Sequence, residues 1–214
     1  MSTPTNLVQS WGRLERSACI ALDLADRTRV AELVQRPGPA GLAYGNGRSY
    51  GDVCLNPEGR LWRTRALDRF IAFDPATGIV HCEAGVLLSE LTAVTLPQGW
   101  FLAVTPGTQF VTVGGAIAND VHGKNHHLTG TFGRHVRRFS LARTDGSLLD
   151  CSPHDNAGLY AATIGGLGLT GVVVDAELQL RRVPGPWVDV ETIAFENLDA
   201  FFALSEQSQT EYTV

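Results

Sequence analysis

The 214-residue sequence lacks any excess of positive charge, because 17 lysines and arginines stand against 22 aspartates and glutamates and give a formal net charge of −5. Proteins that bind nucleic acids or anionic membranes cluster their basic residues. Here the basic residues are scattered apart from short pairs such as Arg137-Arg138 and Arg181-Arg182. We therefore expect no nucleic-acid partner and no anionic lipid surface.

Long hydrophobic runs and paired cysteines are also missing. No apolar run approaches the ~20 residues that a membrane helix needs, and the first residues, MSTPTNLVQSWGRLERS, lack the basic start and apolar stretch of a signal peptide. The four cysteines, Cys19, Cys54, Cys82 and Cys151, lie far apart and form no C-x-x-C pair. Neither a structural metal site nor a disulfide framework is predicted, and the expected setting is a cytoplasmic protein with reduced thiols and no transmembrane segment.

Glycine, by contrast, is abundant and clustered. Of the 23 glycines, 14 lie in three clusters, at positions 41–51, 107–133 and 165–171. Glycine costs roughly 0.5–1 kcal/mol inside regular structure, so three dense clusters indicate a repeated need for unusual dihedrals or close backbone approach. One long ligand that contacts all three clusters would explain them.

Between the clusters the pattern predicts alternating short strands and helices. Helices are predicted at 26–35, 87–96, 113–118, 159–164 and 198–208. Strands are predicted at 41–44, 70–73, 79–83, 101–104, 136–142, 147–151, 171–180, 188–195 and 211–214. The composition changes after Val183-Pro184-Gly185-Pro186, so residues 1–183 are expected to form one domain and residues 184–214 a linker and the beginning of a truncated second domain.

The first cluster, AYGNGRSYGD at 43–52, allows three interpretations. A Rossmann dinucleotide site is disfavoured, because the third glycine of G-x-G-x-x-G comes one residue late, at Gly51, and a loop with proline follows instead of a helix. A tight surface loop is the plainest alternative. The favoured interpretation is a non-helical nest of backbone N–H groups for a pyrophosphate, with Arg48, Ser49 and Tyr50 as further donors.

The stretch HGKNHH at 122–127 invites a metal interpretation, but its spacing is no metal signature and no carboxylate or cysteine cluster accompanies it. The remaining alternatives are a loop of structurally hydrogen-bonded histidines and an active-site loop in which His122 and Lys124 offer positive charge. The small residues of VGGAIA at 113–118 would let the backbone lie against a flat group, although close helix packing explains them as well. IGGLGLTG at 164–171 has the same character.

Four segments carry a family resemblance: AYGNGRSYGD, PGTQFVTVGGAIANDVHGKNHH, TFGRHVRRFSLARTDG and ATIGGLGLTG. Together they closely resemble the FAD-binding domain of the vanillyl-alcohol-oxidase-like, PCMH-type flavoprotein superfamily. Within it the chain is most similar to the decaprenylphosphoryl-β-D-ribose 2-oxidase group and to neighbouring aldonolactone and alditol oxidases. Over residues 11–183 the resemblance implies two α+β subdomains that hold FAD between them, followed by a substrate (cap) domain of which 184–214 would be the start.

The resemblance also implies site residues. Tyr50, His122 and Lys124 would lie close to the flavin and the substrate. In covalent relatives a histidine stands at the position of Arg48, or a cysteine near that of Phe110, so the resemblance predicts FAD held non-covalently here. The implied cofactor-binding residues are Ala43, Tyr44, Gly45, Asn46, Gly47, Arg48, Ser49, Tyr50, Gly51, Asp52, Val53, Gly107, Thr112, Val113, Gly114, Gly115, Asn119, Asp120, Val121, His122 and Val173.

The function expected from these features is that of an FAD-dependent oxidoreductase, a nucleotide-binding flavoprotein that passes hydride from a sugar or polyol carbinol carbon to flavin N5 and yields a ketone or lactone. The residue that removes the hydroxyl proton is not identified and is expected in a further domain, so these 214 residues alone are expected to be inactive. The alternatives are an FAD-binding module or subunit without catalysis of its own and an aldonolactone- or alditol-type oxidase. The sequence assigns neither the electron acceptor nor the oligomeric state.

Overall fold

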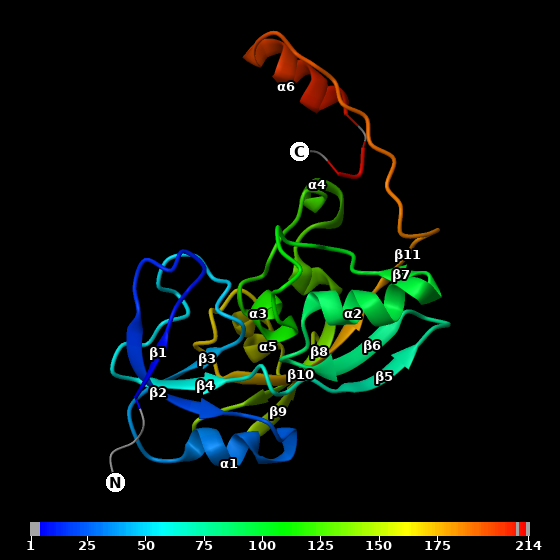
Figure 1. Ribbon diagram of the computed structural model, residues 1–214. Helices are drawn as coiled ribbons and strands as arrows, with labels where there is room; N and C mark the ends of the chain where they lie inside the picture. The colour runs from blue at the N-terminus through cyan, green and yellow to red at the C-terminus, as the bar shows by residue number, and fades with distance from the viewer. Residues whose placement is uncertain (1–4, 209, 213–214) are drawn as a thin grey trace.

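The computed structural model describes residues 5–208 and 210–212 of the chain (Figure 1). Two larger sheets lie side by side, with helices packed around them, a third sheet of two short strands and a separate C-terminal helix. The strands are β1 Thr5–Val8, β2 Ser17–Asp23, β3 Gly41–Tyr44, β4 Arg60–Arg63, β5 Phe70–Asp74, β6 Ile79–Glu83, β7 Trp100–Phe101, β8 Val136–Ala142, β9 Leu148–Cys151, β10 Val172–Gln179 and β11 Arg181–Arg182. The helices are α1 Val30–Gln35, α2 Leu88–Thr95, α3 Val113–Ala118, α4 His126–Thr129, α5 Ala157–Thr163 and α6 Leu198–Gln207.

The first sheet has the strand order β1-β2-β4-β3, in which β2, β4 and β3 run parallel and β1 is antiparallel to β2. Parallel neighbours need a long crossover connection, which is usually a helix. Between β3 and β4 the crossover is instead the irregular segment 45–59, which begins with the first glycine cluster. Because this crossover is not a helix, the backbone N–H groups of 45–48 take no part in helical hydrogen bonds.

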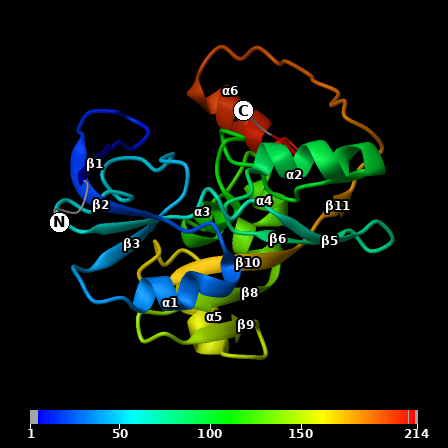
Figure 2. The same ribbon diagram turned by 60° about the horizontal axis from the view of Figure 1, so that its bottom comes forward.

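The second sheet is antiparallel, in the order β5-β6-β10-β8-β9. The largest hydrophobic cluster, which includes Leu91 of α2, Ile117 of α3 and Phe139 of β8, joins α2 and α3 to one face of this sheet. A second cluster packs Val30 and Val34 of α1 against the other face and against Trp62 of β4, so it connects the two sheets. Figure 1 shows α1 beneath the sheets, and Figure 2, in which the bottom of that view comes forward, shows α1 on the side away from α2.

Most of the predicted elements are present. The strand over 41–44 and the helix over 113–118 are observed with the predicted bounds. Both predicted hairpins are antiparallel pairs, β5 with β6 and β8 with β9. Asp26 caps the turn before α1, because its side chain accepts a hydrogen bond from the backbone N–H of Thr28.

Two predicted strands are wrong. The strand predicted over 101–104 is only the two-residue β7, because its partner β11 pairs only with Phe101 and Trp100. The segment 188–195 forms no strand despite its β-branched residues, since no described segment lies beside it to complete a hydrogen-bonded ladder. At the C-terminus, Glu211 and Tyr212 are not in a strand, and residues 213–214 lie outside the described part of the chain.

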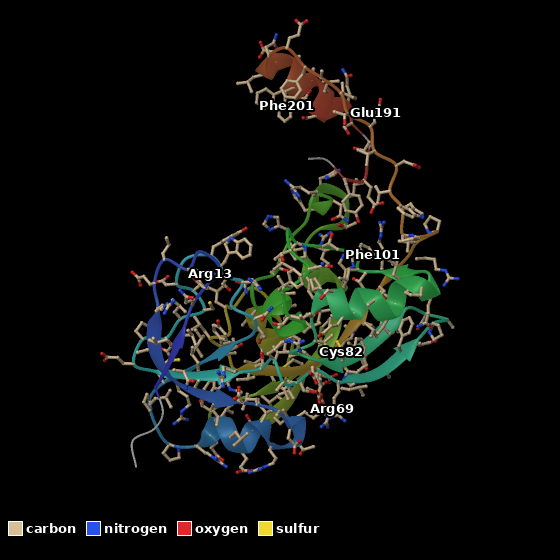
Figure 3. All side chains as sticks on the ribbon, in the orientation of Figure 1. Arg13, Arg69, Cys82, Phe101, Glu191 and Phe201 are labelled. Atoms are coloured by element: carbon tan, nitrogen blue, oxygen red, sulfur yellow. The ribbon has the colours of Figure 1, made fainter. Side chains whose placement is uncertain are left out.

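The chain after β11 leaves the body of the molecule and ends in α6. Figure 1 shows this segment extending away from both sheets, and Figure 3 shows Phe201 of α6 far from Cys82, which lies in the interior. None of the residues of α6 is buried. The tail returns to the body, where the His127 imidazole lies 3.2 Å from the backbone oxygen of Thr210 and Arg181 pairs with Glu211. Within the described residues, no helix has both the length and the apolar character needed to cross a membrane.

Candidate functional site

A cavity of about 470 Å³ opens between the two sheets, and three runs of chain that are far apart in sequence form most of its wall. The first run follows β3, the second contains α3, and the third precedes β10. The lining residues are Trp11, Ala43, Gly45, Asn46, Gly47, Arg48, Ser49, Tyr50, Val53, Cys54, Thr64, Pro106, Gly107, Thr108, Val111, Thr112, Gly114, Gly115, Ala118, Asn119, Val121, His122, Thr163, Leu167, Gly168, Gly171 and Val173.

The first run is a glycine loop with free backbone donors. Among the described residues, no acceptor is found for the backbone N–H groups of 45–48. Gly47 has a φ of +61°, and a Cβ there would lie 2.3 Å from the Tyr44 hydroxyl and 2.8 Å from the Gln9 carbonyl oxygen. A residue with a side chain does not fit at position 47, so glycine is required by both the dihedral and the close approach.

The second run is fixed to the first by side-chain contacts. Thr112 caps α3, because its hydroxyl accepts a hydrogen bond from the Gly115 backbone N–H at 3.1 Å. A Cβ on Gly45 would lie 2.4 Å from that same hydroxyl. The Asn46 amide donates to the Phe110 carbonyl at 2.9 Å. The two runs therefore meet at a spacing that only glycine at position 45 permits.

The small residues of α3 serve close packing as well. Gly114 donates its backbone N–H to the Ala84 carbonyl at 2.8 Å, and an added Cβ would lie 3.0 Å from the Ala84 methyl group. Gly114 and Gly115 nevertheless line the cavity. Both interpretations of this glycine pair, a ligand-facing wall and close helix packing, are consistent with the structure.

The third run follows α5 and is joined to α3 through the backbone. The Leu167 N–H donates to the Ala118 carbonyl at 2.8 Å. The hydroxyls of Thr163 and Thr170 lie 2.9 Å apart and close the run into a compact loop. Gly168 in this loop has a φ of +78°. All three runs are thus connected by hydrogen bonds around a single cavity.

The cavity wall has no carboxylate among its described lining residues. Its side chains with basic groups are Arg48 and His122. The Arg48 Nε atom is buried and has no hydrogen-bond partner among the described residues. A wall of free N–H groups with an unpaired guanidinium favours a negatively charged ligand.

The segment 122–127, which carries three histidines, contributes one residue to the cavity wall. His122 lines the cavity, whereas Lys124 is exposed outside the lining, and its predicted role stays a prediction. The buried Asn125 anchors the loop by donating to the Ala103 carbonyl at 2.9 Å. The ring centroids of His122 and His126 are 5.9 Å apart in an edge arrangement. No cluster of three or more metal-ligating side chains occurs in the described part of the chain.

Cys54 is a cavity residue that the sequence did not single out. Burial raises the pKa of its thiol above the ordinary value of 9.0. The group is therefore a neutral thiol at pH 7, and a neutral thiol is a poor nucleophile.

Most of the predicted cofactor residues line the cavity. Those that do not are Tyr44, Gly51, Asp52, Val113 and Asp120. Tyr44 instead donates from its hydroxyl to the Gln9 carbonyl, and the Asp120 carboxylate accepts from the Gly133 backbone N–H, so both support neighbouring backbone. The sequence did not indicate Trp11 and Cys54 in the wall, because tertiary contacts place them there and no local motif marks them. Thr163 also lines the wall and was not predicted, although it lies within the segment ATIGGLGLTG.

Comparison with known proteins gives a consistent result. A family model described as an FAD binding domain matches residues 21–152. The chain is 36% identical over 217 residues to decaprenylphosphoryl-beta-D-ribose oxidase of Mycolicibacterium smegmatis, an alignment that covers 99% of this chain and 47% of that protein. It is 31% identical over 137 residues to L-gulonolactone oxidase of Mus musculus, covering 63% of this chain and 30% of the relative. With Delta(24)-sterol reductase of Homo sapiens the identity is 32% over 107 residues, covering 50% and 21%. The chain spans about half the length of the first of these relatives and less of the others.

Proposed function

The chain belongs to the FAD-binding, PCMH-type flavoprotein superfamily, and from this premise we propose that the cavity binds FAD non-covalently and serves the oxidation of a CH–OH group. The observation that carries the proposal is the single cavity enclosed by three glycine-bearing runs. The family match supports the cofactor, and the wall supports its location.

The residues of the wall fit such a cofactor. A cavity of about 470 Å³ falls within the ~300–1,000 Å³ usual for small-molecule sites. The free N–H groups of 45–48 suit a diphosphate, which needs several donors and no neighbouring carboxylate. Gly107 has no atom within 4 Å of an added Cβ, so its backbone borders open space.

Each run has its own part in the proposed site. The N–H groups of 45–48 and the Arg48 guanidinium bind negative charge, while Gly114, Gly115 and Gly168 let the backbone lie close to flat groups. His122 offers a hydrogen bond to a substrate oxygen or to the cofactor, and Tyr50 offers its hydroxyl at the cavity edge. When bound, FAD supplies a two-electron acceptor for the hydride that leaves the carbinol carbon. The proposal names no residue of the described chain as the base that removes the proton from the substrate hydroxyl.

Non-covalent attachment is supported by side chains in the wall and by Phe110 beside it. Position 48 is an arginine, position 110 is a phenylalanine, and the Cys54 thiol has a raised pKa. The test is acid precipitation of the FAD-loaded protein. We expect the yellow colour in the supernatant. Colour that stays with the wild-type pellet but not with that of Cys54→Ser would contradict the proposal and identify the attachment.

The names of two relatives, a decaprenylphosphoryl-ribose oxidase and an L-gulonolactone oxidase, support a sugar or sugar-derived substrate. The test mixes the whole FAD-loaded protein, without oxygen, with phosphosugars, aldonolactones and alditols. The expected result is loss of visible flavin absorbance with a CH–OH compound and none with the analogue that is deoxygenated at the reacting carbon. Absorbance that falls with dithionite but with no compound of the panel would favour the alternative of a binding module.

A further inference from the structure

The loop between β1 and β2, residues 9–16, lies against the glycine loop. The Trp11 backbone N–H donates to the Ser49 carbonyl at 3.1 Å, and the Gln9 carbonyl accepts from the Tyr44 hydroxyl at 2.8 Å. Figure 3 labels Arg13 two residues beyond Trp11, on this same loop. These bonds bring the Trp11 indole into the cavity wall, although 36 positions separate it from the last lining glycine of the loop, Gly47.

The half-buried Arg48 side chain lies against two aromatic rings. The carbon at the centre of its guanidinium lies 5.7 Å from the centroid of the Trp11 ring and 5.9 Å from that of Phe110. Arg63 and Arg65 pair with carboxylates, whereas no described carboxylate pairs with Arg48. In the described part of the chain, its buried Nε atom has no acceptor. The two rings therefore orient the guanidinium without neutralising its charge.

We propose that Trp11 and Phe110 are positioning residues that hold the Arg48 guanidinium in the cavity as a fixed positive charge for FAD. The inference rests on the proposed binding of FAD in this cavity. An ion pair would fix the arginine equally well but would cancel its charge, whereas aromatic rings fix it and leave the charge for the ligand. FAD has negative charge on its diphosphate in both oxidation states, and its ring system gains negative charge on reduction.

The test is a double-mutant cycle in which the dissociation constant of FAD is measured for each variant by flavin fluorescence. Only variants whose spectra match those of the native fold after refolding are compared. Trp11→Ala is expected to weaken binding about tenfold, which corresponds to about 1.4 kcal/mol. In the Arg48→Gln background the same change is expected to alter the dissociation constant less than about twofold, because the guanidinium that Trp11 orients is no longer present. Phe110→Ala is expected to behave in the same way.

Two further variants separate positioning from packing. Trp11→Phe keeps an aromatic face and is expected to bind FAD within about threefold of the wild type. Leu14→Ala is the matched control from the same loop, because Leu14 is 91% exposed and lies outside the cavity wall, and no change is expected.

Comparing oxidised with dithionite-reduced FAD shows which part of FAD the charge serves. A loss in Arg48→Gln that is equal for both forms indicates the diphosphate, and a larger loss for the reduced form indicates the ring.

The inference is overturned if Trp11→Ala leaves FAD binding unchanged, or if it weakens binding equally with and without Arg48. These outcomes are distinct from failure of the proposed function, since in both the wild-type protein binds FAD. A wild-type protein that binds no FAD contradicts the proposed function itself.

Discussion

At the scale of single residues, the site depends on positions where a side chain would not fit. Gly45 and Gly47 stand where an added Cβ would meet other atoms at 2.4 Å and 2.3 Å. The glycine clusters in the sequence indicated these positions, because glycine is the residue that such dihedrals and approaches demand. Trp11 and Cys54 could not be predicted from sequence, since tertiary contacts alone bring them into the wall.

Gly47→Ala and Gly51→Ala form a matched pair of changes. Both glycines have positive φ, +61° and +57°, but an added Cβ at Gly51 has no atom within 4 Å. Gly51→Ala is expected to cost about 1–2 kcal/mol of unfolding free energy from the dihedral alone. Gly47→Ala is expected to cost more and to weaken FAD binding. Equal losses in urea unfolding would contradict the close approach of Gln9 and Tyr44 to Gly47.

Cys54 offers a chemical probe of the cavity. Because burial raises the pKa of its thiol above 9.0, the thiolate is scarcer in the folded protein than in the unfolded chain at neutral pH. Alkylation by iodoacetamide is therefore expected to be slower at pH 8 in the folded protein, and to become faster as the pH rises through and beyond 9. Peptide mass mapping of the alkylated protein measures the rate, with Cys54→Ser as the control.

FAD is expected to protect Cys54 further, since the thiol lines the cavity. The other three cysteines are buried and serve as internal references. If Cys54 is alkylated as fast as in an unfolded peptide, or equally fast with and without saturating FAD, its place in the wall of the FAD-binding cavity is contradicted.

At the scale of elements, the hairpins and α3 were predictable because turn residues, caps and glycines mark them locally. β2 and β4 were missed because they are short parallel neighbours whose pairing depends on residues about 40 positions apart. The strand predicted over 188–195 shows the opposite error. Its residues favour extended structure, but a strand forms only where another backbone completes its hydrogen bonds.

Thr112 links one such element, α3, to the site. Thr112→Ala removes the acceptor for the Gly115 N–H and is expected to lower the unfolding free energy by about 1 kcal/mol. Thr112→Ser keeps the hydroxyl and is expected to lose much less, as measured by urea unfolding. If the serine variant is as unstable as the alanine variant, the lost methyl packing rather than the cap explains the effect.

At the scale of the whole molecule, the cavity belongs to neither sheet alone. The glycine loop continues from β3 of the first sheet, and α3 packs against the second. A ligand that contacts both is expected to couple their stabilities, because it binds only when both are folded and correctly placed.

Thermal unfolding tests this coupling. FAD at about 100 times its dissociation constant is expected to stabilise the fold by about 2.7 kcal/mol and to raise the temperature of one cooperative transition. ADP and FMN each contain part of FAD, contact fewer of the three runs and are expected to stabilise the fold less. A shift confined to part of the transition, or equal shifts from ADP and FAD, would contradict a ligand that spans both sheets.

The most direct measurement of the central claim is a crystal structure of the protein with saturating FAD. The account predicts one FAD molecule in the cavity, in contact with the glycine loop after β3, with the 112–115 segment and with the loop before β10. FAD bound elsewhere on the molecule, or a cavity that stays empty at saturating FAD, would contradict it.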